Sequence, residues 1–215
     1  MSKVVIVDYQ LGNLFSVKQA LNSIGLNVIL SNSPAEIASA DALILPGVGA
    51  FGDAMINLKK QDLVAPIKDC VAAGKPFLGI CLGLQLLFTE SEEFGANKGL
   101  NLIPGLVKRF YNYDKNGEVV KVPQIAWNEI YPLHQQWENT PLKNLNVNEH
   151  MYFVHSFYVE PLEKDCVLSL TNYRGTEYTS SVCKNNIFAC QFHPEKSATK
   201  GLGIYKNWAI QNKIK

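Results

Sequence analysis

Cys81 lies in a stretch with the features of a nucleophile held at a sharp turn. Residues 74–88 contain a Gly-Lys-Pro break, a short apolar run, the sequence Gly-Ile-Cys-Leu-Gly and a helix-like Leu-Gln-Leu-Leu-Phe segment. Glycines on both sides of a reactive residue allow a strand to enter a helix through a turn too tight for larger side chains. This turn would place the thiol beside the free N–H groups of the next helix, which favour a thiolate. By itself, the stretch fits a buried core cysteine equally well.

His193 and Glu195 provide the partners that a cysteine nucleophile needs. They follow a predicted last strand, Phe188–Phe192, and Pro194 between them disfavours a helix. Residues i and i+2 of an extended segment point the same way. The carboxylate would therefore orient the imidazole, and the other ring nitrogen would face the thiol and accept its proton.

A glycine-rich loop, residues 47–52, follows another predicted buried strand. Its three glycines fit an ordinary flexible turn, but they also allow a backbone to approach a ligand closely. The carboxyl ends of parallel strands meet at one edge of a sheet, so Cys81, His193 and this loop are predicted to converge there. Their convergence favours a catalytic Cys81 over a structural one.

The elements that must position these groups alternate regularly in the first half of the chain. Short apolar runs predict buried strands at residues 4–9, 28–30 and 42–45, with Pro46 ending the third. Apolar residues spaced by three and four predict helices between them, one of them capped by Ser33. The resulting order, βαβαβααβ, predicts a parallel sheet with helices on its faces.

After Gly95 the pattern changes to short apolar segments separated by Gly, Asn and Pro. Hairpin turns are predicted at residues 114–117 and 184–186, and a last helix, capped by Ser197, to about Ala209. Strands are predicted at residues 106–110, 119–122, 125–127, 151–159, 167–170 and 180–183. We therefore expect an α/β fold: a mostly parallel central sheet with flanking helices and a mixed or antiparallel extension.

Composition narrows the class of protein. A hydrophobic content of 47% and a net charge of +1 predict one globular domain, residues 1–215, without the electrostatic footprint of a nucleic-acid or membrane binder. The N-terminus lacks signal-peptide features, and five cysteines without a Cys-x-x-Cys pair indicate reduced thiols in the cytoplasm. His134 is expected at the surface. His150 and His155 lack a third ligand, so we expect no metal.

Two of the motifs together resemble those of class I (triad) glutamine amidotransferases. The family signatures are Gly-x-Cys-x-Gly-x-Gln and a late His-Pro-Glu, which correspond to Gly79–Gln85 and His193–Glu195. In α/β-hydrolases, by contrast, the acid precedes the histidine. The resemblance spans nearly the whole chain. It implies a flavodoxin-like architecture, a single amidotransferase domain and a reaction without a cofactor.

Within the family, several stretches are similar to those of the glutaminase subunits of imidazole glycerol phosphate synthases. They are Asp8-Tyr9, Gly12–Leu14, Leu45–Phe51, Pro123–Asn128, Tyr152–Ser156 and Gln191–Ser197. This similarity implies hydrolysis of L-glutamine and transfer of ammonia to a (β/α)₈ cyclase partner, in a heterodimer of histidine biosynthesis. A docked partner is also expected because ammonia released into water is protonated and loses its nucleophilicity.

The resemblance also implies roles for individual residues. Cys81 would form a glutamyl thioester, His193 would transfer protons, and Glu195 would orient His193. The backbone of Leu82 and the loop Gly47-Val48-Gly49 would stabilise the oxyanion. The remaining implied contacts are Gln85, Glu93, Ser156 and Phe157 to the glutamine, and Trp127, Tyr152 and Lys196 at the partner interface and ammonia exit.

One stretch departs from the family pattern. The family commonly has His and then Gly before the tryptophan, where this chain has Gln124, Ile125 and Ala126 before Trp127. The stretch is expected to face the partner and not Cys81, so the departure bears on the identity of partner and acceptor. The alternatives are a paralogous amidotransferase subunit, for example of a cell-surface sugar pathway, a partner-independent cysteine hydrolase, and a non-catalytic interaction subunit.

Overall fold

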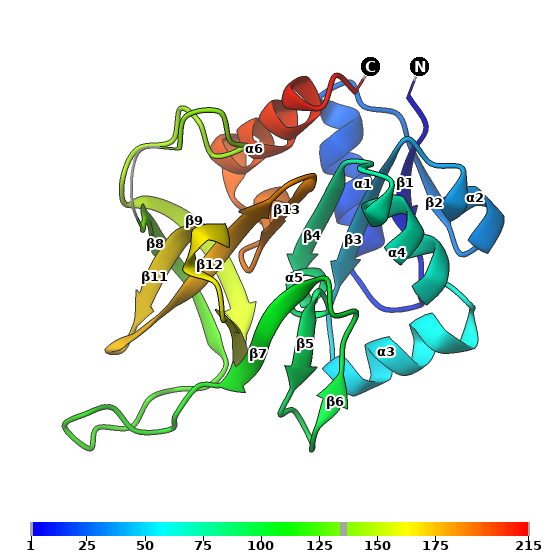
Figure 1. Ribbon diagram of the computed structural model, residues 1–215. Coiled ribbons are helices and arrows are strands. Elements are labelled where there is room, and N and C mark those ends of the chain that lie inside the picture. The colour runs from blue at the N-terminus through cyan, green and yellow to red at the C-terminus, as the bar shows by residue number, and fades with distance from the viewer. Residues whose placement is uncertain (1, 134–136, 215) are drawn as a thin grey trace.

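The computed structural model describes residues 2–133 and 137–214, so His134 lies outside the described residues. Strands from both halves of the chain join into one sheet with helices on its faces (Figure 1). Its main path runs β2 (Val28–Ser31), β1 (Val4–Val7), β3 (Ala42–Gly47), β4 (Phe77–Cys81), β13 (Ile187–Cys190), β12 (Thr176–Lys184), β10 (Phe157–Pro161), β7 (Ile103–Arg109), β5 (Phe88–Ser91) and β6 (Asn97–Lys98).

The two halves of this sheet differ in direction, as predicted. The strands β2, β1, β3, β4 and β13 are all parallel, whereas β13–β12 and β10–β7 are antiparallel pairs. A branch of three strands leaves the path at β12: β11 (Val167–Tyr173), β8 (Gln124–Pro132) and β9 (Glu149–His155). In Figure 1 this branch stands apart from the parallel strands.

Helices cover both faces of the parallel strands. α1 (Leu14–Ser23) and α6 (Ala198–Gln211) pack on one face, and α2 (Pro34–Ala38), α3 (Phe51–Lys60) and α4 (Val64–Ala72) contribute to the core of the other. The inner strands β1, β3 and β4, and also β13, are buried on both sides, whereas Ile29 of the edge strand β2 is exposed. In β1, Val4 and Ile6 face the first layer, and Val5 and Val7 the second. This burial explains the continuous apolar runs in the sequence.

The predicted order βαβαβααβ is confirmed from β1 to β4. Ser33 caps α2, since its hydroxyl accepts a hydrogen bond from the Glu36 N–H at 3.5 Å. Pro46, however, does not end β3, which continues to Gly47. β1 pairs with β3 only as far as Ile44, so the missing N–H of Pro46 breaks no ladder on that side.

The second half contains three differences from the predicted strands. The segment 151–159 is two strands, β9 and β10, which are separated at Ser156. Residues 119–122 form no strand, and Val119 makes only an isolated bridge to Tyr113. β5 and β6 were not predicted. The turns at 114–117 and 185–186 are present. Within the described part of the chain, no helix is long and apolar enough to cross a membrane.

Candidate active site

Cys81 ends β4 in the sharp turn that the sequence predicts. Its φ and ψ are 55° and −110°, a combination that costs energy for a residue with a side chain. The helix after it, α5 (Leu82–Gln85), is a single turn, and the longer helix expected from residues 84–88 is wrong. The chain instead returns to the sheet as β5, because Leu86 and Leu87 accept backbone hydrogen bonds from the segment after β6.

The two glycines that flank Cys81 are required by packing. A Cβ added at Gly83 would overlap the carbonyl oxygen of Leu45 in β3, and one at Gly79 would lie 2.9 Å from the Cβ of Ala189 in β13. Neither glycine has a positive φ. Their role is therefore to let α5 and the neighbouring strands approach the turn closely.

His193 and Glu195 are in contact, as predicted, although the backbone between them differs from the expected extended segment. His193 is extended, but residues Pro194–Lys196 form a turn of 3₁₀ helix. His193 Nδ1 donates to Glu195 Oε1 at 2.7 Å, and both side chains are buried. The hydroxyl of Tyr205, on α6, donates to Glu195 Oε2 at 3.2 Å. The carboxylate thus has one fixed partner on each oxygen.

The Nε2 atom of His193 is buried and makes no hydrogen bond within the described residues. The thiol of Cys81 instead points to the carbonyl of Val154, 3.8 Å away, so the S–H must turn for its proton to reach His193. Burial by itself lowers the pKa of His193, but the negative charge of a Cys81 thiolate, the hydrogen bond that this sulfur would accept from His193, and the hydrogen bond and charge of Glu195 outweigh it and raise the pKa to about 10. The site therefore favours an imidazolium whenever Cys81 is ionised.

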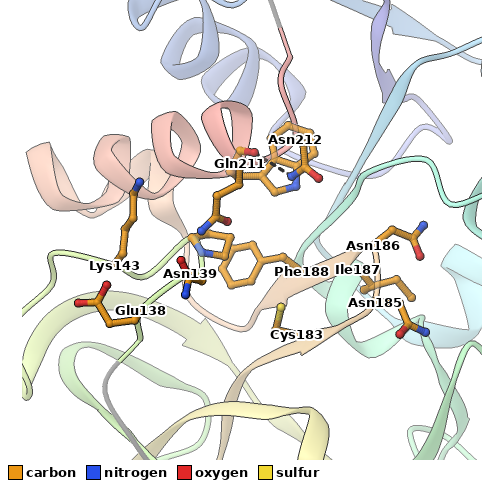
Figure 2. A pocket seen from close by; sticks show the side chains of 12 residues that line it. Glu138, Asn139, Lys143, Cys183, Asn185, Asn186, Ile187, Phe188, Gln211 and Asn212 are labelled. Atoms are coloured by element: carbon orange, nitrogen blue, oxygen red, sulfur yellow. Dashed lines mark hydrogen bonds between the residues drawn. The ribbon is translucent and has the colours of Figure 1, made fainter.

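A cavity of about 260 Å³ opens in front of Cys81. The structure brings the predicted substrate contacts together around it, with the exception of Gly47. They are Val48, Gly49, Leu82, Gln85, Glu93, Ser156 and Phe157. A roomier cavity of about 460 Å³ lies at the opposite end of β13, by Ile187, and carboxamide side chains line much of it (Figure 2). That cavity contains none of the predicted site residues, so the smaller one is the candidate active site.

Gly47 lies behind the cavity and supports its glycine-rich wall. It pairs directly with Cys81 in the β3–β4 register. A Cβ at this position would overlap the hydroxyl oxygen of Tyr9, which donates to the carbonyl of Pro46 at 2.8 Å. Burial raises the pKa of Tyr9, so its hydroxyl keeps the proton that this bond needs. Asp8-Tyr9 is one of the stretches that resemble the family, but the sequence did not predict that Tyr9 supports the glycine-rich wall.

Two predicted substrate contacts already have partners within the protein. Glu93 Oε2 accepts from the N–H of Phe51 at 2.6 Å and so closes the N-terminus of α3. Burial raises the pKa of Glu93, and the Phe51 N–H opposes this. The amide nitrogen of Gln85 donates to the carbonyl of Phe157 at 2.9 Å and to Gln191 Oε1 at 3.1 Å. Glu93 Oε1 and Gln85 Oε1 are therefore the atoms of these two side chains that remain for a ligand.

Gln191 is a site residue that was not predicted. It is fully buried, and its amide nitrogen lies 3.6 Å from Cys81 Sγ, within the range of a hydrogen bond to sulfur. The signal that could have identified it is its position two residues before His193. An N–H directed at the sulfur stabilises a thiolate.

The predicted interface residues form one cluster at the surface. Trp127 and Tyr152 are cross-strand neighbours on β8 and β9, with ring centroids 6.0 Å apart. The ammonium group of Lys196 lies 5.7 Å from the centroid of the Tyr152 ring. Trp127 is half exposed. The expectation that the preceding stretch faces only outward is wrong for Gln124, which is fully buried and contacts Tyr178.

Comparisons with known proteins agree with this geometry. The family model "Glutamine amidotransferase class-I" matches residues 5–212. The imidazole glycerol phosphate synthase subunit HisH of Syntrophotalea carbinolica is 48% identical over 206 residues, which cover 95% of this chain and 98% of the relative. The corresponding HisH subunit of Gloeothece citriformis is 41% identical and covers 100% of this chain and 99% of its own.

Among solved structures, a glutamine amidotransferase superposes with a TM-score of 0.72 over 97% of this chain and 98% of its own. The sequence identity to it is 18%, so this similarity concerns the fold alone. The α/β architecture predicted from the sequence, with its mixed sheet and flanking helices, is that of the amidotransferase structures.

Proposed function

Because the chain belongs to the class-I glutamine amidotransferase family, we propose that it is the glutaminase subunit of an imidazole glycerol phosphate synthase. It hydrolyses L-glutamine in the cytoplasm and supplies the ammonia to a (β/α)₈ cyclase subunit for histidine biosynthesis. One observation carries the proposal: Cys81 lies at a strained turn, against a cavity whose other wall holds the predicted substrate contacts, and His193 and Glu195 are paired behind it.

The first half of the reaction uses Cys81 as the nucleophile and His193 as the base. Cys81 Sγ attacks the side-chain carbonyl carbon of glutamine as its proton passes to His193 Nε2. The oxyanion that forms is stabilised by the N–H of Leu82 and by the backbone of Val48 and Gly49, which line the cavity in front of Gly47. The C–N bond then breaks, ammonia leaves with the proton from His193, and a glutamyl thioester remains on Cys81.

The second half restores the enzyme. His193 takes a proton from a water molecule that attacks the thioester carbonyl, and the C–S bond breaks to release glutamate. The proton returns to the sulfur of Cys81. Throughout the cycle, Glu195 keeps the imidazole in one orientation and stabilises its charged form, while Gln191 donates to the sulfur.

The substrate backbone groups are bound at the far side of the cavity. The free oxygen atoms of Glu93 and Gln85 suit the ammonium group of the glutamine. The carbonyl of Phe157 already accepts two hydrogen bonds, from Gln85 and from His155 Nδ1 at 2.8 Å, and so has no lone pair left for the substrate. Ser156, at the break between β9 and β10, supplies any backbone contact there.

The cluster of Trp127, Tyr152 and Lys196 is the proposed docking surface for the cyclase. Trp127 and Tyr152 lie on the strands β8 and β9. The same two strands reach the active site, where Val154 and His155 of β9 line the cavity. We infer that ammonia released at Cys81 passes along these strands to the partner, which would keep it out of bulk water. The curated relatives at 41–48% identity are named as synthase subunits, which supports a partner of this kind.

The proposal is tested by purifying the chain with a candidate cyclase subunit and measuring glutamine hydrolysis. We expect a stable complex, and an increase in hydrolysis when the acceptor of the cyclase is bound. Equal turnover of glutamine and of simple esters by the chain alone would instead identify a partner-independent hydrolase. Failure to bind the cyclase would overturn the assignment to this synthase.

Replacing Tyr205 with phenylalanine should slow glutamine hydrolysis without affecting substrate binding. The change removes the 3.2 Å hydrogen bond to Glu195 and keeps the ring, so Glu195 loses one of its two fixed partners. A hydrogen bond of about 1 kcal/mol corresponds to a fall in kcat of about fivefold, with KM unchanged. Tyr131→Phe is the matched control, because it removes a tyrosine–carboxylate bond, to Glu177, on the strand branch. An equal effect of both substitutions would contradict the role of Tyr205.

A further inference from the structure

A buried polar cluster lies directly behind the active-site cavity. Gln124 on β8 and His155 on β9 are cross-strand partners, and Tyr178 on β12 lies between their side chains. The Tyr178 oxygen is 3.0 Å from Gln124 Oε1 and 3.3 Å from His155 Nε2. Aromatic rings surround the cluster, with Phe110 and Phe153 packed against both His155 and Tyr178. The side chains of the cluster are buried, and the buried hydroxyl of Thr171, the cross-strand partner of Tyr178, adjoins it. Most of its polar atoms must therefore find partners within the protein.

The number of hydrogen atoms in this cluster determines the direction of its hydrogen bonds. Three contacts need one hydrogen each: His155 Nδ1 to the carbonyl of Phe157, His155 Nε2 to Tyr178, and Tyr178 to Gln124. A neutral imidazole provides one hydrogen and the tyrosine hydroxyl a second. Burial lowers the pKa of His155 to about 4, so a second proton on the ring is disfavoured at neutral pH. Of the three side chains that make these contacts, Gln124 is the one with a further hydrogen to donate, on its amide nitrogen.

The amide nitrogen of Gln124 can provide the third hydrogen, which the contact with Tyr178 needs. Gln124 Nε2 is buried without a hydrogen-bond partner, while its oxygen faces the hydroxyl of Tyr178. Turning the carboxamide by half a rotation exchanges the two atoms and places a donor against the hydroxyl of Tyr178. The amide then donates to Tyr178, Tyr178 donates to His155 Nε2, and His155 Nδ1 donates to the carbonyl of Phe157. In this arrangement each of the three contacts carries one hydrogen bond.

The carbonyl of Phe157 connects the cluster to the nucleophile. It accepts hydrogen bonds from His155 Nδ1 at 2.8 Å and from Gln85 at 2.9 Å. The same amide of Gln85 donates to Gln191 Oε1 at 3.1 Å, which directs the amide of Gln191 at Cys81 Sγ. A continuous hydrogen-bonded path therefore runs from a residue beside the proposed docking surface to the reacting sulfur.

We propose that Gln124 is a positioning residue for glutamine hydrolysis, which fixes the hydroxyl of Tyr178, the tautomer of His155 and, through the carbonyl of Phe157, the amides of Gln85 and Gln191. The inference rests on the proposed glutaminase function. It assigns a role to the position at which this chain departs from the family pattern. In this role an acceptor-only side chain cannot replace Gln124, because it would take the hydrogen of Tyr178 and leave His155 Nε2 without a donor.

The test compares Gln124→Glu with Gln124→Met in the full chain. The introduced carboxylate reverses the bond to Tyr178, whereas the apolar methionine leaves Tyr178 free to donate to His155. Nitrogen NMR of ¹⁵N-histidine-labelled protein reports the tautomer of His155, and kcat and KM for glutamine are measured with the cyclase partner bound. We expect the Nδ1–H tautomer in the wild type and in Gln124→Met. In Gln124→Glu we expect a proton on Nε2 and a fall in kcat of about tenfold, the effect of one hydrogen bond to a charged group.

Two further measurements separate positioning from packing. Lowering the pH protonates the introduced carboxyl, which can then donate to Tyr178, so the activity of Gln124→Glu relative to the wild type should rise. In a Tyr178→Phe background the introduced carboxylate has no hydroxyl to act through, so Gln124→Glu should cost no further activity. An equal loss in Gln124→Met and Gln124→Glu would overturn the proposal.

The wild-type spectrum is decisive even if a variant does not fold. A wild-type His155 in the Nε2–H tautomer would overturn the proposed direction of the hydrogen bonds, whatever the activity. A wild-type complex without glutamine hydrolysis would overturn the proposed function instead, and the tautomer would still report on the cluster. The two failures are therefore distinguishable.

Discussion

Replacing Cys81 with alanine is expected to abolish synthesis from glutamine while synthesis from added ammonium salts continues. Among the described residues that line the cavity, Cys81 is the one that carries sulfur, and the substitution leaves His193, Glu195 and the proposed docking surface in place. Loss of the nucleophile from a catalytic triad lowers kcat by a factor of at least about 10⁴. The acceptor reaction in the cyclase needs only ammonia, so it should proceed at its usual rate. The measurement is turnover of the complex with each nitrogen source.

Cys183→Ala is the control for this experiment. Cys183 is a free, partly buried thiol on β12 that lines the other cavity, at the opposite end of β13. Its loss should change neither activity. If glutamine-dependent turnover survived in Cys81→Ala, the covalent mechanism would be wrong. If both activities disappeared together, the cysteine would be needed for assembly instead of chemistry.

Replacing Gly83 with alanine is expected to destabilise the protein strongly. The added methyl group would overlap the carbonyl oxygen of Leu45, which belongs to the central strand β3 and cannot move without disturbing the sheet. We expect the free energy of unfolding to fall by at least about 3 kcal/mol, as for other overpacked buried positions. Urea denaturation measures this change, and glutamine hydrolysis should fall with it because Cys81 adjoins the displaced turn.

Gly203→Ala provides the matched control, since Gly203 also lies in a helix, α6, and a Cβ there meets no atom within 4 Å. This substitution should raise the free energy of unfolding by about 0.5–1 kcal/mol, because alanine loses less conformational freedom than glycine in a helix. Equal stabilities of the two variants would show that the turn at Cys81 tolerates a side chain.

The parallel half of the sheet could be predicted because its signals are local. Runs such as Val4–Val7 are apolar throughout, as is typical of strands buried on both faces. In the helices between them, apolar residues recur every three to four positions. Residues 84–88 show the limit of this reasoning. A short apolar run fits a helix as well as a strand, and here hydrogen bonds from the segment after β6 decide in favour of β5.

The site followed the same rule. Cys81 and the pair of His193 and Glu195 were identified because each belongs to a short motif. Tyr9 and Tyr205 were not, because each acts on a residue that only the folded chain brings near. Tyr9 is 37 positions in the sequence from the Pro46 carbonyl to which it donates a hydrogen bond. Tyr205 lies on the apolar face of the last helix, where nothing in the sequence marks its contact with Glu195. Gln124 was expected to face the partner because the family resemblance assigned the whole stretch to that surface. Which of its side chains are buried depends on the register of β8 with β9, which the sequence does not show.

Glu93 contacts both a helix N-terminus and the active-site cavity, and this has a practical consequence. One carboxylate both closes the start of α3, through the N–H of Phe51, and lines the cavity in front of Cys81. A ligand cation that pairs with Glu93 draws charge away from this hydrogen bond. The amide resonance of Phe51 is therefore a built-in reporter of cavity occupancy, and it allows ligand titrations by NMR in a protein whose catalysis has been switched off.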